Sequence, residues 1–123
     1  MISVDSSGWI ERLSGGPKAS AYRRIIDAAA PAEIVTSVVA VYEVYKKIKR
    51  AKGELAALEA VAALGQTRVI PVDQELALEA ADYSLSLGLH FADALVYATA
   101  QRYQATLYTS DRELSHAAGV TTV

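Results

Sequence analysis

Hydrophobic positions follow two different periods along the chain. Short apolar runs, typical of buried strands, lie at 1–5, 34–36, 69–72, 106–109 and 120–123. Between them, apolar residues recur three and four positions apart and predict helices over 6–13, 18–30, 37–52, 54–64, 76–87 and 91–104, with a short helix after 111. Strands that alternate with helices indicate an α/β fold. We expect a three-layer α/β/α arrangement around a mostly parallel central sheet.

Individual residues set the expected ends of these elements. Ser6 and Ser7 are good helix starters, and Ser37 and Asp73 are placed to cap the helices that follow them. Pro71 lies in the third apolar run and indicates an edge strand or an early end. For the helix after Ser37 we predict an apolar stripe. Its members are Val38, Val41, Tyr42, Tyr45 and Ile48.

Length and composition limit the possible classes of protein. The 123 residues fit a single domain, 1–123, with no repeat or linker. The absence of cysteine excludes disulfides and thiolate metal sites, so a metal would need oxygen or histidine ligands. No signal peptide or membrane-spanning run is recognisable, and we expect a soluble, cytoplasmic protein. The net charge of −2 argues against nucleic-acid binding through overall positive charge, but allows a local basic patch.

Four acidic residues occupy unusual positions. Asp5 and Asp111 follow predicted strands, Glu43 interrupts an apolar helical run, and Asp93 lies at the start of a strongly apolar helix. The carboxyl ends of parallel strands share one edge of a sheet, where ligands usually bind. Carboxylates gathered there would repel one another unless a cation were present, and such oxygen ligands suit Mg²⁺ or Mn²⁺.

Each of these acids also has a purely structural interpretation. Asp5 and Asp111 could cap the helices that follow them, although Ser6 or Ser7 could cap the first one. Glu43 could form an ion pair with Lys46 or Lys47, one helical turn away. Asp93 could interact favourably with its helix dipole. These interpretations weaken when the four acids are considered together, because the predicted fold can bring all of them to one end.

The acids and their surroundings resemble the PIN-domain family, and most closely its VapC-like toxins. The resemblance covers nearly the whole chain and is carried by residues 2–7, 42–44, 91–100 and 107–111. The segment Phe91-Ala92-Asp93-Ala94-Leu95-Val96-Tyr97-Ala98-Thr99-Ala100 is the most specific of these. One difference from the family is Leu114, which stands a few positions after the fourth acid, where members often carry an aromatic residue.

The resemblance implies a Mg²⁺-dependent (or Mn²⁺-dependent) endoribonuclease that cleaves RNA phosphodiesters with metal-activated water. It assigns catalytic and metal-binding roles to Asp5, Glu43, Asp93 and Asp111, and supporting hydrogen bonds to Thr109 and Ser7. It also implies a cognate antitoxin protein, as in a type II toxin–antitoxin system, and commonly a homodimer. The helical segments 18–30 and 37–64 offer apolar surface for either contact.

Three basic residues follow the second acid on the same helical face: Lys46, Lys47 and Arg50. They are candidate RNA-binding residues that would contact phosphates. The alternative is a solvated helix whose charges pair with one another.

Two other functions compete with the nuclease. A catalytically inactive PIN-like module that binds RNA or protein would keep the fold, but the complete set of acids argues against it. A phospho-accepting receiver domain also combines an alternating fold with an acidic pocket, and Asp73 does follow a strand. That class requires a lysine after a late strand, and no lysine follows position 52.

Overall fold

Five parallel strands form the centre of the protein, in the spatial order β3-β2-β1-β4-β5. A computed structural model describes all 123 residues. The strands are β1 (Ile2–Val4), β2 (Ile34–Ser37), β3 (Arg68–Ile70), β4 (Thr106–Thr109) and β5 (Val120–Thr122). The predicted parallel α/β fold is therefore confirmed, and β1, the strand that leads to Asp5, is the middle one.

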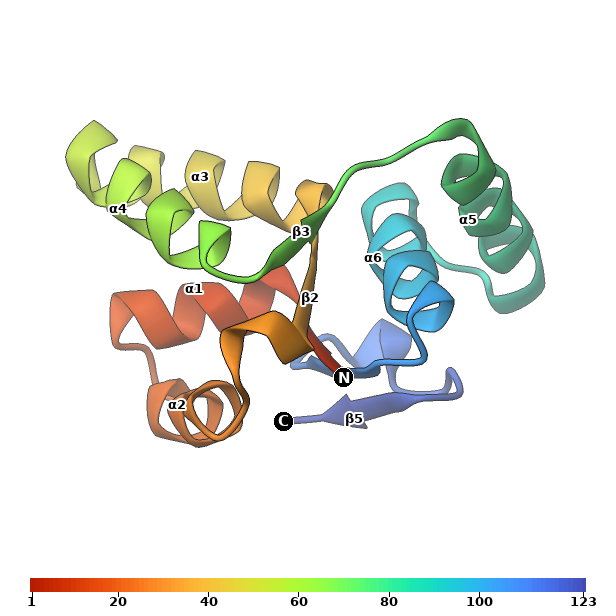
Figure 1. Cartoon of the computed structure of the whole chain (residues 1–123), viewed down its shortest axis with the longest axis horizontal. Coiled ribbons are helices and arrows are strands. Elements are labelled where there is room, and N and C mark those ends of the chain that lie inside the picture. The colour runs from red at the N-terminus through yellow and green to blue at the C-terminus, as the bar shows by residue number, and fades with distance from the viewer.

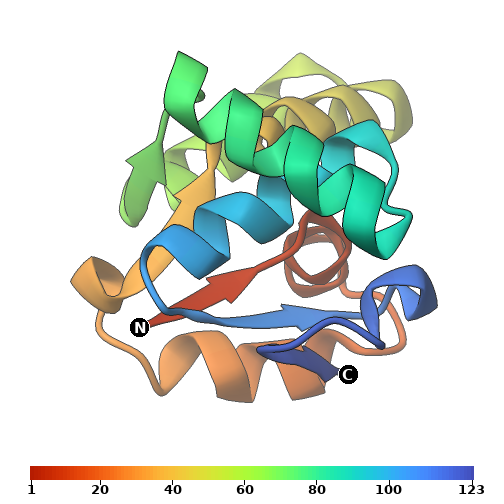
Figure 2. The same ribbon diagram turned by 90° about the vertical axis from the view of Figure 1, so that its right-hand side faces the viewer.

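Helices cover both faces of this sheet. Six α-helices are present: α1 (Ser6–Ser14), α2 (Ala19–Asp27), α3 (Val38–Lys52), α4 (Glu54–Gly65), α5 (Gln74–Leu87) and α6 (Phe91–Arg102). Two 3₁₀ turns, Pro31–Glu33 and Arg112–Leu114, precede β2 and follow β4. Figures 1 and 2 show α5 and α6 on one side of the strands and α1 to α4 on the other. None of the helices combines the length and the hydropathy that a membrane-spanning segment needs.

The hydrophobic core is divided by the sheet into two clusters. One cluster joins α5 and α6 to Leu107 of β4, and the other joins α1 to α4 to Val4 and Ile34. Gly8 of α1 lies tightly between α2 and β1, because a Cβ atom there would come within 2.3 Å of the Tyr22 ring and 2.7 Å of the Val4 side chain. Glycine at this position lets α1 and α2 pack directly beneath β1.

The helix starts are mostly as predicted, with one correction. Ser37 and Asp73 accept hydrogen bonds from Val39 and Leu76 and cap α3 and α5. At α1, however, the cap is Asp5 itself, whose Oδ1 accepts from the Ser6 amide at 2.8 Å, and neither serine is the cap. The carboxylate is the better acceptor for an unpaired amide at a positive helix end. Asp5 therefore caps α1, and this role does not prevent it from belonging to the predicted acidic site.

Only part of the predicted apolar stripe of α3 faces the core: Ile48 is buried, and Val41 and Tyr45 are partly buried against it. The buried residues are Ala40, Val44 and Ile48, whereas Tyr42 is 62% and Val38 is 39% exposed. The run from 38 to 45 is apolar nearly all round, so its spacing alone does not select a face. Contact with α4 and the sheet selects it, and Tyr42 is left on the surface.

The remaining differences are small. The second helix ends at Asp27, before the predicted end at residue 30, and Pro31 then begins a 3₁₀ turn. The last helix ends at Arg102, and β3 begins one residue earlier and ends two residues earlier than predicted. Both outer strands, β3 and β5, lie at edges of the sheet, as the proline at 71 and the terminal position of β5 predicted.

Candidate active site

Asp5 lies at the carboxyl end of the central strand and is almost fully buried, with 4% of its surface exposed. Because Val4 of β1 is paired with Tyr108 of β4, the next residues, Asp5 and Thr109, are level with each other. The Thr109 hydroxyl donates to Asp5 Oδ2 at 2.8 Å, and the Ser7 hydroxyl donates to the same oxygen at 3.3 Å. Both residues predicted to support the site therefore contact its first acid.

A second group of carboxylates lies beside Asp5. Asp93, in the first turn of α6, Asp111, after β4, and Glu113 each place a carboxylate oxygen within 4.8 Å of the others. Asp111 is fixed from two sides, because its amide donates to the Thr109 hydroxyl at 2.9 Å and its Oδ1 accepts from the Glu113 amide at 2.9 Å. The 3₁₀ turn after β4 thus brings Glu113 back towards Asp93.

Glu113 is the residue that sequence analysis missed. The pattern after position 111 predicts only an ordinary short helix, without a role for Glu113 in the site. The available signal is its spacing of two residues from Asp111, in a segment that directly follows a strand end. The capping hydrogen bond from the Glu113 amide to Asp111 Oδ1 holds Glu113 close to that acid.

Glu43 approaches the site from α3, which begins directly at the end of β2, the other neighbour of β1. Burial raises the pKa of the Glu43 carboxyl, a hydrogen bond with the Ser6 side chain lowers it, and the charge of Asp5 raises it. No lysine or arginine nitrogen lies within 4.0 Å of Glu43. The alternative interpretation, an ion pair with Lys46 or Lys47, is therefore wrong.

Electrostatics join the four predicted acids into one site. Burial, followed by the charges of the other three acids and a hydrogen bond with Asp111, raises the pKa of Asp93 to about 7. Burial also raises the pKa of Asp5, partly offset by hydrogen bonds from Thr109, Ser6 and Ser7. Carboxylates from β1, α3, α6 and the segment after β4 therefore oppose one another's ionisation.

This set of donors fits a divalent cation. Carboxylate oxygens are the preferred ligands of Mg²⁺ and Mn²⁺. A carboxylate offers about four acceptor positions, and Asp5 uses three of its own for Ser6, Ser7 and Thr109. A position remains for a metal ion, whose charge would offset the repulsion that raises the pKa of Asp93.

A chain of hydroxyl groups supports Asp5 from behind. The buried Tyr22 hydroxyl lies 2.6 Å from Ser110 Oγ, and the Ser110 amide donates to Ser7 Oγ at 3.4 Å. Ser7 in turn donates to Asp5. The arrangement connects α2 to the site through the end of β4, and holds the carboxylate in one orientation.

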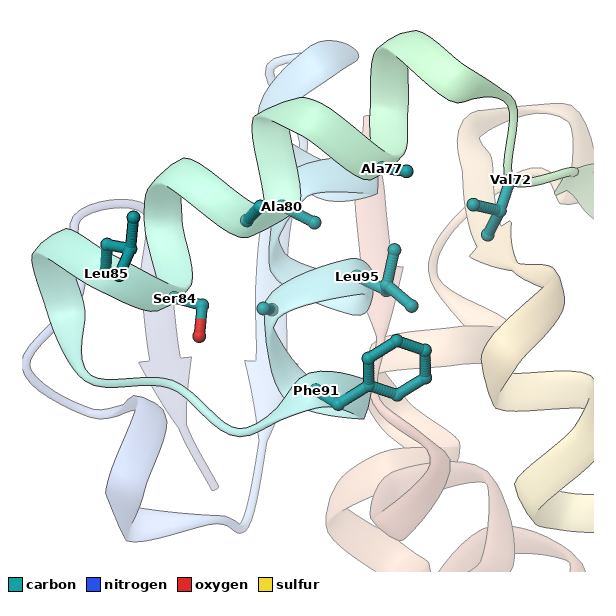
Figure 3. A pocket seen from close by; sticks show the side chains of 9 residues that line it. Val72, Ala77, Ala80, Ser84, Leu85, Phe91 and Leu95 are labelled. Atoms are coloured by element: carbon teal, nitrogen blue, oxygen red, sulfur yellow. The ribbon is translucent and has the colours of Figure 1, made fainter.

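Two cavities lie beside α3 and α6, the helices that carry Glu43 and Asp93, and they differ in chemistry. One, of about 580 Å³, lies between α1 and α3 and includes Lys46, Lys47 and Arg50. The other, of about 520 Å³, lies between α5 and α6, with Val72 at one end (Figure 3). It contains no ionisable side chain, so only the first cavity suits a phosphate.

Comparisons with known proteins agree with this fold. The model of the PIN-domain family matches residues 2–120. A chain of a toxin–antitoxin complex from Klebsiella pneumoniae superimposes with a TM-score of 0.83 at 24% identity, covering 99% of this chain and 97% of that chain. VapC20 of Mycobacterium tuberculosis, a sarcin–ricin-loop-cleaving toxin, gives a TM-score of 0.79 at 21% identity, covering 96% and 95%.

FitAcB from Neisseria gonorrhoeae gives a TM-score of 0.74 at 21% identity, with 99% of this chain and 96% of that chain covered. At these identities the structural likeness concerns the fold alone. No curated protein sequence matches the chain.

Proposed function

The chain belongs to the PIN-domain family, and from this premise we propose that it is a metal-dependent endoribonuclease, the toxin of a toxin–antitoxin pair. The observation that carries the proposal is the convergence of Asp5, Glu43, Asp93 and Asp111. Burial and, after it, the charges of the other three acids raise the pKa of Asp93 to about 7. A protein maintains such mutual repulsion at a cost in stability, which a bound cation removes. VapC20, which shares the fold, is described as a toxin that cleaves the sarcin–ricin loop.

The acids would divide the work according to their surroundings. Asp5, Glu43 and Asp93 are the main ligands for Mg²⁺ or Mn²⁺, and Asp111 holds a second ion or a water. Thr109 and Ser7 orient Asp5 through the hydrogen bonds described above. When bound, the metal supplies a lowered pKa for a coordinated water and neutralises charge on the phosphate.

The basic residues of α3 would guide the RNA. Lys46, Lys47 and Arg50 line the cavity that also includes Glu43. An RNA phosphate bound there is held beside the carboxylates, so these three basic side chains offset the repulsion between a polyanion and an acidic site. The three basic residues thus contribute to substrate affinity and leave the chemical step to the acids.

The proposed antitoxin would bind on a different surface. A groove of about 470 Å³ between α1, α2 and α4 is lined by apolar side chains such as Leu13 and Ile26. Two buried nitrogen atoms in its wall, Trp9 Nε1 and Arg12 Nε, have no hydrogen-bond acceptor within the chain. An apolar segment of the antitoxin would pack against the apolar side chains of the groove. On the same family premise, we expect a homodimer and a cytoplasmic location.

Cleavage of RNA by three forms of the protein tests the proposed activity. We expect the wild type to cleave RNA with Mg²⁺ and not with EDTA. Asp5→Asn and Asp93→Asn should each lower the rate on the order of 100-fold or more, because each removes a charge that holds the metal. The matched control is Asp82→Asn, an exposed aspartate of α5 that forms no ion pair.

The control variant should cleave like the wild type. Circular dichroism must show that all the variants are folded, since removal of like-charge repulsion changes their stability. Full activity of both site variants would exclude the proposed mechanism. A wild type that binds RNA without metal and does not cleave it when Mg²⁺ is added would instead indicate an inactive binding module.

A further inference from the structure

A basic groove continues the acidic site along the surface. It lies between α1 and α3, and its walls include Ser6, Ser7 and Glu43 at one end and Arg50 at the other. At 1.5 Å per residue, the distance along α3 from Glu43 to Arg50 is roughly 10 Å. The volume of about 580 Å³ is within the usual range for small-ligand pockets, about 300–1,000 Å³. The groove is therefore of nucleotide dimensions.

The positive charges of this groove are unneutralised. No carboxylate oxygen lies within 4.0 Å of the side-chain nitrogens of Lys46, Lys47 or Arg50. Lys49, on the same helix but outside the groove, does have such a partner, Glu54 at 3.7 Å. Cations that converge on a groove without protein counter-charges are well placed to bind phosphates.

Tyr42 adds an aromatic surface to the same groove. The residue is 62% exposed and lines the groove together with Glu43 and Lys46. The Lys46 ammonium lies 3.4 Å from the Tyr42 hydroxyl and 5.5 Å from the ring centroid. A base stacked on the ring therefore brings its own phosphate towards Lys46. Exposed rings next to basic side chains are the common means of holding unpaired nucleotides.

We propose that Tyr42 is a base-binding residue of this groove: one RNA base stacks on its ring, next to the scissile phosphate, while the neighbouring phosphates lie on Lys46, Lys47 and Arg50. The proposal rests on the proposed nuclease function and adds Tyr42 to it as a residue that holds one base. In a duplex, each base face is covered by its neighbours within the helix. A single tyrosine on a helix surface can stack only on a base that is free of such neighbours.

Binding measurements separate the two roles of the groove. All variants carry Asp93→Asn, so that cleavage does not interfere, and Kd is measured by fluorescence anisotropy. The ligands are a mixed-sequence single-stranded 12-mer RNA, the same strand annealed to its complement, and inorganic polyphosphate, which has charge but no bases. The variants are Tyr42→Leu, Tyr42→Phe and the triple change of Lys46, Lys47 and Arg50 to Gln, with Lys49→Gln as the matched control.

We expect Tyr42→Leu to weaken single-strand binding on the order of tenfold or more, with Tyr42→Phe close to the parent and polyphosphate binding unchanged. The triple variant should weaken binding of both single-stranded RNA and polyphosphate. It should also make the slope of log K for RNA binding against log salt concentration less steep, by about 0.7 for each phosphate that the protein no longer neutralises. Lys49→Gln should change neither the affinity for RNA nor the affinity for polyphosphate. Leucine is a good helix former at an exposed position, so the fold of the Tyr42 variant is preserved.

Several results would overturn the proposal. The first is equal affinity for duplex and single-stranded RNA, and the second is an equal loss of RNA and polyphosphate binding in Tyr42→Leu. The third is tighter binding of a poly-glutamate peptide than of RNA, which would assign the groove to an acidic protein segment. A wild type that fails to cleave RNA but binds it in this Tyr42-dependent way would contradict the nuclease function and leave the groove assignment standing.

Discussion

At the scale of single residues, Thr109 is a central hydrogen-bonding residue of the site. Its buried hydroxyl donates to Asp5 at 2.8 Å and accepts from the Asp111 amide at 2.9 Å. One side chain thus fixes two acids that come from different parts of the chain. The sequence predicted a supporting role for Thr109, but the pair of hydrogen bonds follows from the register between β1 and β4.

Replacement of Thr109 by Val should therefore affect both stability and metal binding. Removal of the hydroxyl leaves the buried Asp5 carboxylate short of a donor, and we expect the free energy of unfolding to fall by about 1–3 kcal/mol. Mg²⁺ affinity should fall as well, because Asp5 and Asp111 are no longer held in fixed positions. Chemical denaturation and a calorimetric Mg²⁺ titration measure the two effects.

Two further variants make this test specific. Thr109→Ser keeps the hydroxyl and should retain most of the metal affinity. Thr99→Val removes a hydroxyl that is equally buried but bonds only to the Leu95 carbonyl, so it should leave Mg²⁺ binding unchanged. A Thr109→Val protein with unaltered Mg²⁺ affinity would show that the hydroxyl does not organise the site.

At the scale of elements, α3 and α4 present two faces with different tasks. The outer face of α3 carries Tyr42 and the basic groove, whereas α4 forms one wall of the groove that contains Trp9. On α4, Ala63 lines that groove and its neighbour Ala62 is exposed outside it. Adjacent residues of one helix therefore belong to different surfaces.

This arrangement gives a matched pair of variants for the antitoxin contact. Ala63→Glu should weaken binding of the proposed antitoxin at least tenfold, because it places a bulky charged side chain where that partner would pack. Ala62→Glu should have no effect. Surface plasmon resonance with each purified variant measures both affinities, and thermal unfolding checks the fold. Equal effects of the two changes would place the antitoxin elsewhere.

At the scale of the whole molecule, the acidic site couples folding to pH, and the proposed cation would couple it to metal as well. The folded state raises the pKa of Asp93 from 3.8 to about 7 and also raises the pKa values of Asp5 and Glu43. Between about pH 4 and pH 7, the folded protein therefore binds more protons than the unfolded chain. Under that condition the free energy of unfolding falls as pH rises.

We expect the metal-free protein to melt at a lower temperature at pH 8 than at pH 5. Mg²⁺ should raise the melting temperature more at pH 8, because protons compete with the metal at pH 5. Asp93→Asn should weaken both effects, since it removes the most strongly shifted group. Melting curves in EDTA and in Mg²⁺ across this range provide the measurement. A melting temperature independent of both pH and Mg²⁺ in the wild type would contradict a shared cation site.

The sequence by itself determined the elements and the order of the acids. Short apolar runs marked the strands, and capping residues such as Ser37 and Asp73 marked helix starts, because these signals act over a few neighbouring residues. The order and local context of Asp5, Glu43, Asp93 and Asp111 were enough for the family resemblance, which the match of the family model to residues 2–120 confirms.

Only the tertiary structure decided how those elements face one another. The apolar run of α3 is nearly continuous, so packing against α4 and the sheet chose the buried side and left Tyr42 exposed. Likewise, a turn after β4 brought Glu113 beside Asp93. Such outcomes depend on contacts between residues far apart in the chain, and local periodicity carries no information about which side a distant neighbour will cover.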